Sequence, residues 1–219
     1  MNNLINVVAV IPFYNEEKTI SQVVEKTLPF VDKIILVDDG STDNTVKNIP
    51  SNEKVILIKK TQNRGKGYSL NQGFKKSFEL NSKITLTLDA DLQHDPNFIP
   101  YFFKKIVNYD IVIGNRMHSL KKMPIQRIMS NKITSFLMTL KTRQKILDSQ
   151  SGYRAYKTEI LPEILPFYNG FEAESEILVN AARKNYKIGF VDIPTIYGEE
   201  VSKMKALQTI IGFFKVMLK

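Results

Sequence analysis

The sequence contains no cysteine. Disulfides and thiolate metal sites both need this residue, so neither can form, and nothing in the composition calls for an oxidising compartment. Histidine is almost as scarce: His94 and His118 stand apart in the sequence, and we expect each to be structural or incidental. A metal site built from sulfur or from clustered histidines is thereby excluded.

Long apolar runs are also missing. No stretch reaches the roughly 18 uninterrupted apolar residues that span a bilayer. Residues 1–6 lack the basic start and long apolar stretch of a secretory signal, and the apolar run at residues 7–11 is long enough only for a strand. We therefore expect a chain that does not cross a membrane by itself and that works in the cytoplasm.

Acidic residues are absent between Asp110 and Asp148, although the chain as a whole carries a net charge of +9. The cations in this segment are Arg116, Lys121, Lys122, Arg127, Lys132, Lys141, Arg143 and Lys145. Such a block either forms a solvated helical face or attracts an anionic partner such as a phosphorylated substrate, an anionic lipid surface or nucleic acid. We expect no nucleic acid, because the block lacks regularly interleaved aromatic residues.

Short runs rich in Val and Ile alternate with helix-length segments. The predicted strands are residues 7–11, 33–37, 55–58, 84–88 and 111–113, and the predicted helices between them are 16–28, 42–48, 67–80 and 97–107. This alternation predicts an α/β domain with a mainly parallel central sheet and helices on both faces. Ligands of such sheets bind beyond the carboxyl ends of the strands.

The second half of the chain is predicted to contain a basic helix at 122–145, a helix at 172–185, a strand at 188–191 and a C-terminal amphipathic helix. We expect a catalytic domain over residues 1–203 and this last helix over 204–219. Its predicted apolar face consists of Leu207, Ile210, Ile211, Phe214 and Leu218, flanked by Lys205, Lys215 and Lys219. The helix is expected either to dock on the core or to lie in a membrane interface.

Polar clusters follow four of the predicted strands, and the clearest is Asp89-Ala90-Asp91-Leu92-Gln93. If the strand continued, its period of two would point Asp89, Asp91 and Gln93 to one side. Two carboxylates and an amide oxygen suit a hard dication, so we expect Mg²⁺ or Mn²⁺ together with substrate phosphates. A strand that ends in an acidic turn before Pro96 is the alternative.

Six motifs occur together and in order: residues 12–17 (PFYNEE), 37–43 (VDDGSTD), 63–67 (NRGKG), 89–93 (DADLQ), 114–116 (GNR) and 150–154 (QSGYR). With them the chain resembles glycosyltransferase family 2, in its dolichol-phosphate mannosyltransferase and polyprenyl-phosphate glycosyltransferase branch. The resemblance runs from Pro12 to Lys203. It implies a GT-A (Rossmann-like) fold, a nucleotide-sugar donor and a divalent metal.

The resemblance implies a role for residues from several motifs in the donor site. Those assigned to the nucleotide sugar are Pro12, Tyr14, Glu16, Val37, Asp39, Lys66, Asp89, Ala90, Asp91 and Gln93. Asp89, Asp91 and Gln93 correspond to the metal ligands. The glycines and cations of residues 63–67 precede a predicted helix, where main-chain amides and positive charge can approach a phosphate.

The implied acceptor is a polyprenyl or dolichyl phosphate, which is already ionised and needs no general base. Cations that suit its phosphate are Arg116, Arg127, Arg154 and Lys203, of which Arg127 and Arg154 fit a framework role equally well. Glu174 is implied to lie near the active site, although an acid at this predicted helix start also favours the helix dipole. Asp91, Arg116, Glu174 and Lys203 are the residues predicted to serve catalysis.

The predicted activity is inverting, metal-dependent transfer of a hexose of mannose or glucose type from a GDP- or UDP-linked donor to a polyprenyl phosphate. Relatives in this branch often have spanning helices after the catalytic domain, whereas this sequence stops at Lys219. We therefore expect peripheral attachment to the cytoplasmic face of an anionic membrane, or a membrane-anchoring protein partner. A family 2 enzyme with a hydroxyl acceptor and a nucleotide-binding module without activity are the alternatives.

Overall fold

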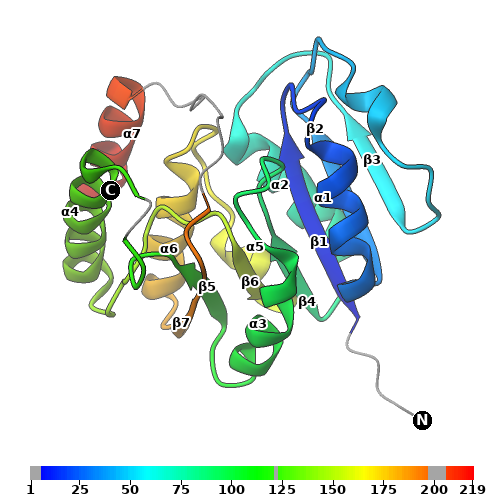
Figure 1. Cartoon of the computed structure of the whole chain (residues 1–219). Coiled ribbons are helices and arrows are strands. Elements are labelled where there is room, and N and C mark those ends of the chain that lie inside the picture. The colour runs from blue at the N-terminus through cyan, green and yellow to red at the C-terminus, as the bar shows by residue number, and fades with distance from the viewer. Residues whose placement is uncertain (1–5, 121–122, 197–205) are drawn as a thin grey trace.

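The computed structural model describes residues 6–120, 123–196 and 206–219. A sheet runs through these residues with helices packed on both faces (Figure 1). Its seven strands within the described ranges are β1 (Val7–Phe13), β2 (Lys33–Asp38), β3 (Val55–Lys59), β4 (Ile84–Thr87), β5 (Ile111–Asn115), β6 (Arg154–Lys157) and β7 (Ile188–Asp192). The spatial order is β3-β2-β1-β4-β6-β5-β7.

The predicted α/β class with a mainly parallel sheet is confirmed. β1 pairs in parallel with β2 and β4, β2 with β3, and β5 with β7. β6 is the exception, because it lies antiparallel between β4 and β5. The sequence predicts no strand there, since four residues after a loop motif give too short a pattern to detect.

The helices are α1 (Ile20–Thr27), α2 (Lys66–Glu79), α3 (Ile99–Ile106), α4 (Ile125–Thr142), α5 (Leu161–Ile164), α6 (Ala173–Arg183) and α7 (Ala206–Leu218). Short 3₁₀ segments lie at Leu28–Phe30, Thr45–Asn48, Pro96–Phe98 and Thr158–Ile160. The helix predicted at 42–48 is therefore only a 3₁₀ turn. Asp43, which accepts from the Thr45 amide at 3.0 Å, stabilises that turn in place of a longer helix.

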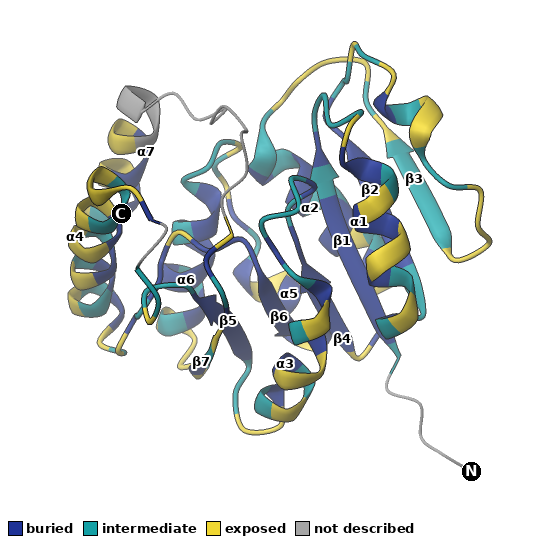
Figure 2. Cartoon of the chain, viewed as in Figure 1, coloured by how far each residue is buried: buried dark blue, intermediate teal, exposed yellow. Residues whose placement is uncertain are grey.

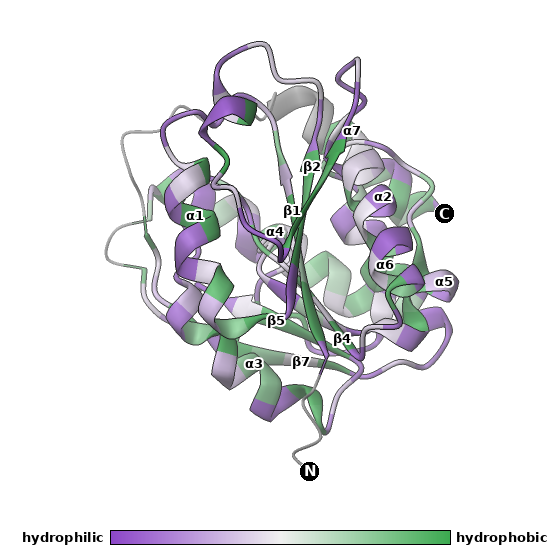
Figure 3. Cartoon of the chain, turned by 90° about the vertical axis from the view of Figure 1, so that its right-hand side faces the viewer, coloured by the Kyte–Doolittle hydropathy of each residue, from purple (hydrophilic) through white to green (hydrophobic). Residues whose placement is uncertain are grey.

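Side chains of β1 alternate between two hydrophobic cores. Val7, Ala9 and Ile11 join the core beneath α1 and α3, whereas Val8 and Val10 join the core beneath α2, α4, α5, α6 and α7. An edge-on view shows helices on both sides of the sheet (Figure 3), and the central strands are buried along most of their length (Figure 2). Strands covered on both faces explain the nearly uninterrupted apolar runs of the sequence.

The C-terminal helix docks on the core, as one of the two expectations had it, but through an unexpected face. Phe213 and Val216 of α7 are buried in the second core. The residues predicted to form the apolar face are exposed instead: Ile210, Ile211, Phe214 and Leu218. Leu207, placed on the same face, lies outside the residues whose side chains are described. The helix therefore has apolar residues on both its docked and its solvent side.

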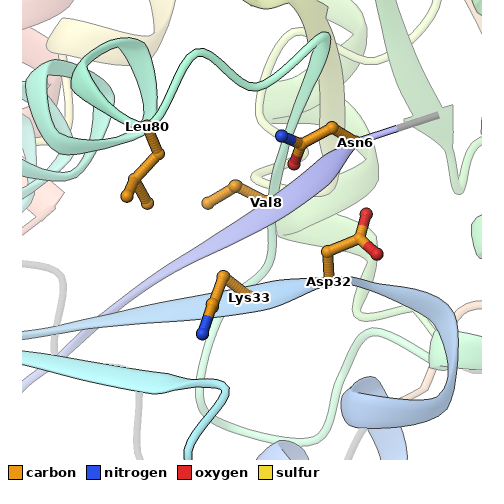
Figure 4. A pocket seen from close by; sticks show the side chains of 5 residues that line it. All are labelled: Asn6, Val8, Asp32, Lys33 and Leu80. Atoms are coloured by element: carbon orange, nitrogen blue, oxygen red, sulfur yellow. The ribbon is translucent and has the colours of Figure 1, made fainter. Parts of the chain in front are cut away.

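A hollow of about 300 Å³ lies at the amino ends of β1 and β2, lined by Asn6, Val8, Asp32, Lys33 and Leu80 (Figure 4). Its polar groups already bind main chain: Asp32 accepts from the Val7 amide at 2.8 Å and Lys33 donates to the Glu53 carbonyl at 3.0 Å. The hollow lies at the opposite edge of the sheet from the polar clusters. Within the described ranges, no helix is both long and apolar enough to cross a membrane.

Candidate active site

The polar clusters predicted at the strand ends meet at one edge of the sheet. β1 and β2 are joined there because the Asp39 amide donates to the Phe13 carbonyl at 2.8 Å and the Asn15 amide donates to Ser41 Oγ at 3.0 Å. Asp89 follows β4 and Arg116 follows β5, and the positive charge of Arg116 acts on the Asp89 carboxyl group. The carboxyl ends of parallel strands share an edge, which explains this convergence.

Asp39 ties the loop at residues 63–65 to the end of β2. Its carboxylate accepts from the amides of Arg64 at 2.9 Å and Gly65 at 2.8 Å, and forms an ion pair with half-buried Lys60. Gly65 has a φ of +95°, and a Cβ there would lie 2.4 Å from the Asn169 carbonyl oxygen. A side chain at this position would therefore be excluded both by its backbone conformation and by the neighbouring chain.

Four main-chain amides in and just after this loop donate to groups of the protein itself. The amides of Arg64 and Gly65 donate to Asp39, and those of Gly67 and Tyr68 donate to the Asn169 carbonyl at 2.7 and 3.3 Å. The glycines instead allow close packing, since a Cβ on Gly67 would lie 2.5 Å from the Ala173 Cβ. Positive charge at Lys66 is what remains of the expected phosphate site.

Of the residues assigned to the nucleoside, Pro12, Tyr14 and Glu16 are half-buried at the end of β1. The Thr19 hydroxyl donates to Glu16 Oε2 at 3.2 Å, which helps to orient that carboxylate. Val37 and Ala90 are different, because both side chains are buried in hydrophobic core. Their side chains support the strand ends from beneath, and the assignment of both residues to the nucleotide sugar stays a prediction.

Lys66 lies between two carboxylates that come from distant parts of the sequence. Its Nζ is 2.6 Å from Asp89 Oδ1, after β4, and 3.1 Å from Glu174 Oε1, in the first turn of α6. Burial alone would raise the pKa of Asp89, but the charge of Lys66 outweighs it and lowers the pKa to about 2. Burial alone would lower the pKa of Lys66, but the two carboxylates raise it. Lys66 and Asp89 are therefore both charged near neutral pH.

His94 positions Asp89, so the structural role applies of the two, structural or incidental, that were expected for this histidine. The Asp89 amide donates to His94 Nδ1 at 3.0 Å, and the ring stacks on Tyr153 with centroids 5.1 Å apart. Burial lowers the pKa of His94, in keeping with a neutral ring whose Nδ1 accepts a hydrogen bond. His94 thus fixes the main chain from which the Asp89 carboxylate projects.

Asp91 and Gln93 lie in a bend and not on a continued strand. β4 ends at Thr87, and Leu92 has a φ of +61°. The chain turns back here, and the main-chain amide of Gln93 donates to Asp91 Oδ1 at 3.0 Å. The alternation by which the sequence analysis grouped Asp89, Asp91 and Gln93 therefore fails, because an irregular turn follows the strand.

The two aspartates nevertheless fit a dication. Burial raises the pKa of Asp91, and the negative charge of nearby Asp89 raises it further. A bound Mg²⁺ or Mn²⁺ would relieve this repulsion between oxygen ligands. No set of three or more His, Cys, Asp or Glu side chains is arranged for metal binding in the described part of the chain. A metal ion held here would be coordinated by one or two of these carboxylates and by oxygen atoms of substrate and water.

Arg116 is held by Asp148 in a two-point ion pair. Its Nε lies 2.8 Å from Asp148 Oδ2 and its second terminal nitrogen 3.0 Å from Oδ1. Asp148 is fully buried, and Asn131 of α4 donates to it at 2.7 Å. Burial alone would raise the pKa of Asp148, but Arg116 outweighs it and lowers the pKa. This arrangement fixes the direction of the Arg116 side chain.

The other predicted acceptor cations have different surroundings. Arg127 is half-buried in the first turn of α4. Arg154 is fully buried and donates to the carbonyls of Ser151 at 2.7 Å, Glu174 at 2.7 Å and Ser149 at 3.0 Å. Of the two roles expected for Arg154, acceptor phosphate or framework, these contacts fit the framework role, which joins the 149–154 loop to α6. Lys203 lies outside the described residues.

Four residues of the site were not assigned by the sequence analysis: Lys60, His94, Asp148 and Gly152. Lys60 and Asp148 form ion pairs with residues that were predicted to belong to the site. Such partners can be identified only in the folded structure. Gly152 lies against the central cluster, because a Cβ there would be 2.7 Å from Asp89 Oδ2 and 2.8 Å from Lys66 Nζ. Its place within the 150–154 motif was the one signal that could have indicated it.

Comparison with known proteins identifies the family of this chain. The pattern that defines glycosyl transferase family 2 matches residues 8–165, and the chain belongs to this family. It is 36% identical to the UDP-N-acetylglucosamine–dolichyl-phosphate N-acetylglucosaminyltransferase of Methanococcus voltae, over 93% of this chain and 90% of the relative. It is 30% identical to the undecaprenyl-phosphate 4-deoxy-4-formamido-L-arabinose transferase of Proteus mirabilis, over 87% of this chain and 60% of the relative. The polyprenyl-phosphate branch named by the resemblance is thus supported.

Solved structures agree on the fold. Glucosyl-3-phosphoglycerate synthase from Mycobacterium tuberculosis, in complex with Mn²⁺, uridine diphosphate and phosphoglyceric acid, aligns with a TM-score of 0.76 at 20% identity. The alignment covers 97% of this chain and 78% of the synthase, and a complex of the synthase with Mg²⁺ and uridine diphosphate aligns with a TM-score of 0.74. The predicted GT-A fold is therefore confirmed.

Proposed function

We propose that this glycosyltransferase moves a sugar from a nucleotide-sugar donor to the phosphate of a polyprenyl lipid. The observation that carries the proposal is the pairing of two charge clusters at one sheet edge. Asp89 with Lys66 and Glu174 forms the first cluster, and Arg116 with Asp148 forms the second. The first suits the diphosphate of a donor, and the second presents a guanidinium to an acceptor phosphate.

The donor is proposed to be a UDP-linked hexose derivative. The Methanococcus voltae relative is named for UDP-N-acetylglucosamine, and the Mycobacterium tuberculosis neighbour is crystallised with uridine diphosphate. N-acetylglucosamine is therefore the first sugar to test, alongside the mannose and glucose types expected from the sequence. Tyr14 and Glu16 are the proposed contacts to the nucleoside, since an aromatic ring can lie beside a base and a carboxylate can accept from ribose.

Asp89 and Asp91 are the proposed ligands of Mg²⁺ or Mn²⁺, with Gln93 as a further oxygen donor. When bound, the ion neutralises negative charge on the departing nucleoside diphosphate. Lys66 adds a second positive charge beside Asp89, and Glu174 keeps that lysine oriented. These residues would thereby stabilise the leaving group without transferring a proton.

In the proposed reaction, an acceptor phosphate oxygen attacks the anomeric carbon of the sugar. The new carbon–oxygen bond forms as the bond to the diphosphate breaks, and the nucleoside diphosphate leaves with the electron pair. A single displacement of this kind inverts the anomeric centre. The attacking oxygen is ionised near neutral pH, so no general base is needed. Arg116 is the proposed guide for this phosphate, with Arg127 and Lys203 as further candidates.

A donor and acceptor panel tests the proposal. The purified chain is incubated with Mn²⁺ and UDP-N-acetylglucosamine, UDP-glucose or GDP-mannose, each with polyprenyl phosphate, and glycolipid is identified by mass spectrometry. We expect a phosphate-linked glycolipid from one donor, and none after chelation of the metal. The matched controls are the unphosphorylated polyprenol and a water-soluble saccharide. Transfer to either control but not to polyprenyl phosphate would contradict the proposal and favour a hydroxyl acceptor.

A further inference from the structure

Helix α4 has an apolar face that the described part of the chain leaves uncovered. Its residues are between 57% and 68% exposed and recur every three or four positions, so they form one stripe along the helix: Ile125, Met129, Ile133, Phe136 and Leu140. We call these residues the α4 stripe. The opposite face of α4 buries Asn131, Ser135, Met138 and Thr142. The stripe is therefore not the face by which α4 joins the core.

Helix α7 lies next to α4 and extends the exposed apolar surface. Lys141 of α4 donates to the Met217 carbonyl of α7 at 3.0 Å. Figures 1 and 2 show the two helices at the same end of the molecule, with exposed turns on both. The exposed side of α7 carries Ile210, Ile211, Phe214 and Leu218, the last of which is 88% exposed. Two neighbouring helices that both expose large apolar side chains mark an interaction surface.

The charged residues of α4 and of the segment just after it are all basic. Lys132 and Lys215 are exposed beside the apolar residues of α4 and α7, and Arg143 and Lys145 are exposed just after α4. No acidic residue lies between Asp110 and Asp148. Apolar residues that enter a bilayer interface beside cations that meet lipid phosphates are the features of a helix lying on an anionic membrane.

We propose that the α4 stripe and the exposed side of α7 form the surface by which this enzyme binds an anionic lipid bilayer. This inference rests on the proposed function, because a polyprenyl phosphate acceptor resides in a membrane. A second copy of the chain suits the surface less well. A symmetric dimer through this face would bring the cations of one copy onto those of the other, and like charges in contact are unfavourable.

The same helix connects this surface to the acceptor side of the active site. On its buried face Asn131 donates to Asp148 at 2.7 Å, and Asp148 holds Arg116. Arg127 and Ile125 share the first turn of α4, so the stripe begins beside a proposed acceptor cation. When the α4 stripe lies on a membrane, the phosphate of a lipid in that membrane would therefore approach Arg116 from the side of the molecule that faces the bilayer.

Vesicle binding of a charged double variant tests the proposal. Ile133→Glu with Phe136→Glu places acids in the middle of the α4 stripe, where both side chains are exposed and the fold does not depend on them. The matched control is Phe78→Glu with Tyr101→Glu, which alters exposed aromatics of α2 and α3. Each protein is sedimented with vesicles of phosphatidylcholine, alone or mixed with phosphatidylglycerol. We expect wild type and control to bind the mixed vesicles, and the stripe variant to bind about tenfold or more weakly.

Two acceptors separate failure of this surface from failure of the proposed function. The stripe variant should retain transfer to a short-chain, water-soluble isoprenyl phosphate and lose transfer to polyprenyl phosphate in vesicles. A stripe variant that binds vesicles as wild type does would overturn the membrane surface. A wild-type dimer that the variant converts to monomer, measured by light scattering, would overturn it too. Wild type that glycosylates neither acceptor would instead contradict the proposed function, and the sedimentation result would still decide the surface.

Discussion

Gly152 lies directly against the Asp89 carboxylate: a Cβ on Gly152 would be 2.7 Å from Asp89 Oδ2 and 2.8 Å from Lys66 Nζ. Both distances are shorter than a carbon atom tolerates, so any side chain at this position must move the ion pair. The main chain of the 149–154 loop is itself fixed, because Arg154 donates to the carbonyls of Ser149 and Ser151. The glycine thus sets where the carboxylate and the ammonium lie.

We expect Gly152→Ala to lower activity about tenfold or more while the protein stays folded. The added methyl group displaces the flexible ends of Asp89 and Lys66, and an error of about 1 Å in a reacting group can cost about a hundredfold in rate. Initial rates and Mn²⁺ affinity by calorimetry measure the effect.

Ser151→Ala is the matched control for this glycine. Ser151 Oγ is buried without a hydrogen-bond partner among the described residues, so its loss removes little. Circular dichroism should show both variants folded. Full activity in Gly152→Ala would show that the position of Asp89 is not critical.

Asp148→Asn is expected to lower the free energy of unfolding at pH 7 by about 3 kcal/mol, because it leaves the poorly exposed Arg116 charge without its counter-ion. The folded-state pKa of Asp148 lies below its ordinary value of 3.8. In acid the unfolded chain therefore takes up this proton first, so the stabilisation is full above pH of about 4 and is lost as pH falls through the lower folded-state pKa. Urea unfolding of wild type and variant between neutral and acid pH measures the difference.

Asp110→Asn is the control for this pH dependence. Asp110 also pairs with a cation, Lys157 at 2.8 Å, but the two side chains are 21% and 34% exposed. Its replacement should cost about 1 kcal/mol or less. An Asp148→Asn difference that stays constant down to strongly acid pH would show that Asp148 is not the titrating group.

The sequence was sufficient to predict six of the seven strands in the described residues, because strands such as β1, β2 and β4 are buried on both faces and consist mostly of apolar and β-branched residues. It was also sufficient to place polar residues at one sheet edge, since parallel strands leave their carboxyl ends together. The sequence could not predict the features of the site that depend on tertiary contacts. Asp148 is 32 positions from Arg116 in the sequence, and its role depends on both lying beside α4.

Local geometry explains two further differences. The left-handed Leu92 interrupts the strand period on which the grouping of Asp89, Asp91 and Gln93 relied. In α7, apolar residues occur on two sides, so periodicity alone gave a face but could not tell which one the core would cover. Phe213 and Val216 are covered because α4 and α6 lie on that side.

His94→Ala is expected to reduce activity about tenfold. The change removes the acceptor for the Asp89 amide at 3.0 Å and the ring that stacks on Tyr153. A main chain that loses this partner can shift, and the carboxylate moves with it. His118→Ala, which alters the other histidine of the chain, is the control and should retain most activity. Equal losses in the two variants would argue against a specific positioning role for His94.

The variant Glu174→Gln distinguishes two roles of this acid, which are to pair with a lysine of the donor site and to stabilise the dipole of its own helix. Glu174 Oε1 lies 3.1 Å from Lys66 Nζ, and the residue also falls in the first turn of α6, where negative charge stabilises the helix dipole. If the ion pair matters for the donor site, the variant should lose about tenfold or more in kcat/KM. If the dipole is the whole role, the variant should lose about 0.3 to 1 kcal/mol of unfolding free energy and little activity.

Glu172→Gln makes the same change of charge at the N-cap of the same helix. It should lower stability by a similar amount and leave kcat/KM near wild type, because Lys66 pairs with Glu174. Rates across a range of pH then distinguish orientation from proton transfer. A base that removes a proton from a hydroxyl acceptor would give wild type an acid limb that Glu174→Gln abolishes. The lysine–carboxylate pair predicts instead that the variant keeps the shape of the wild-type profile at a lower rate.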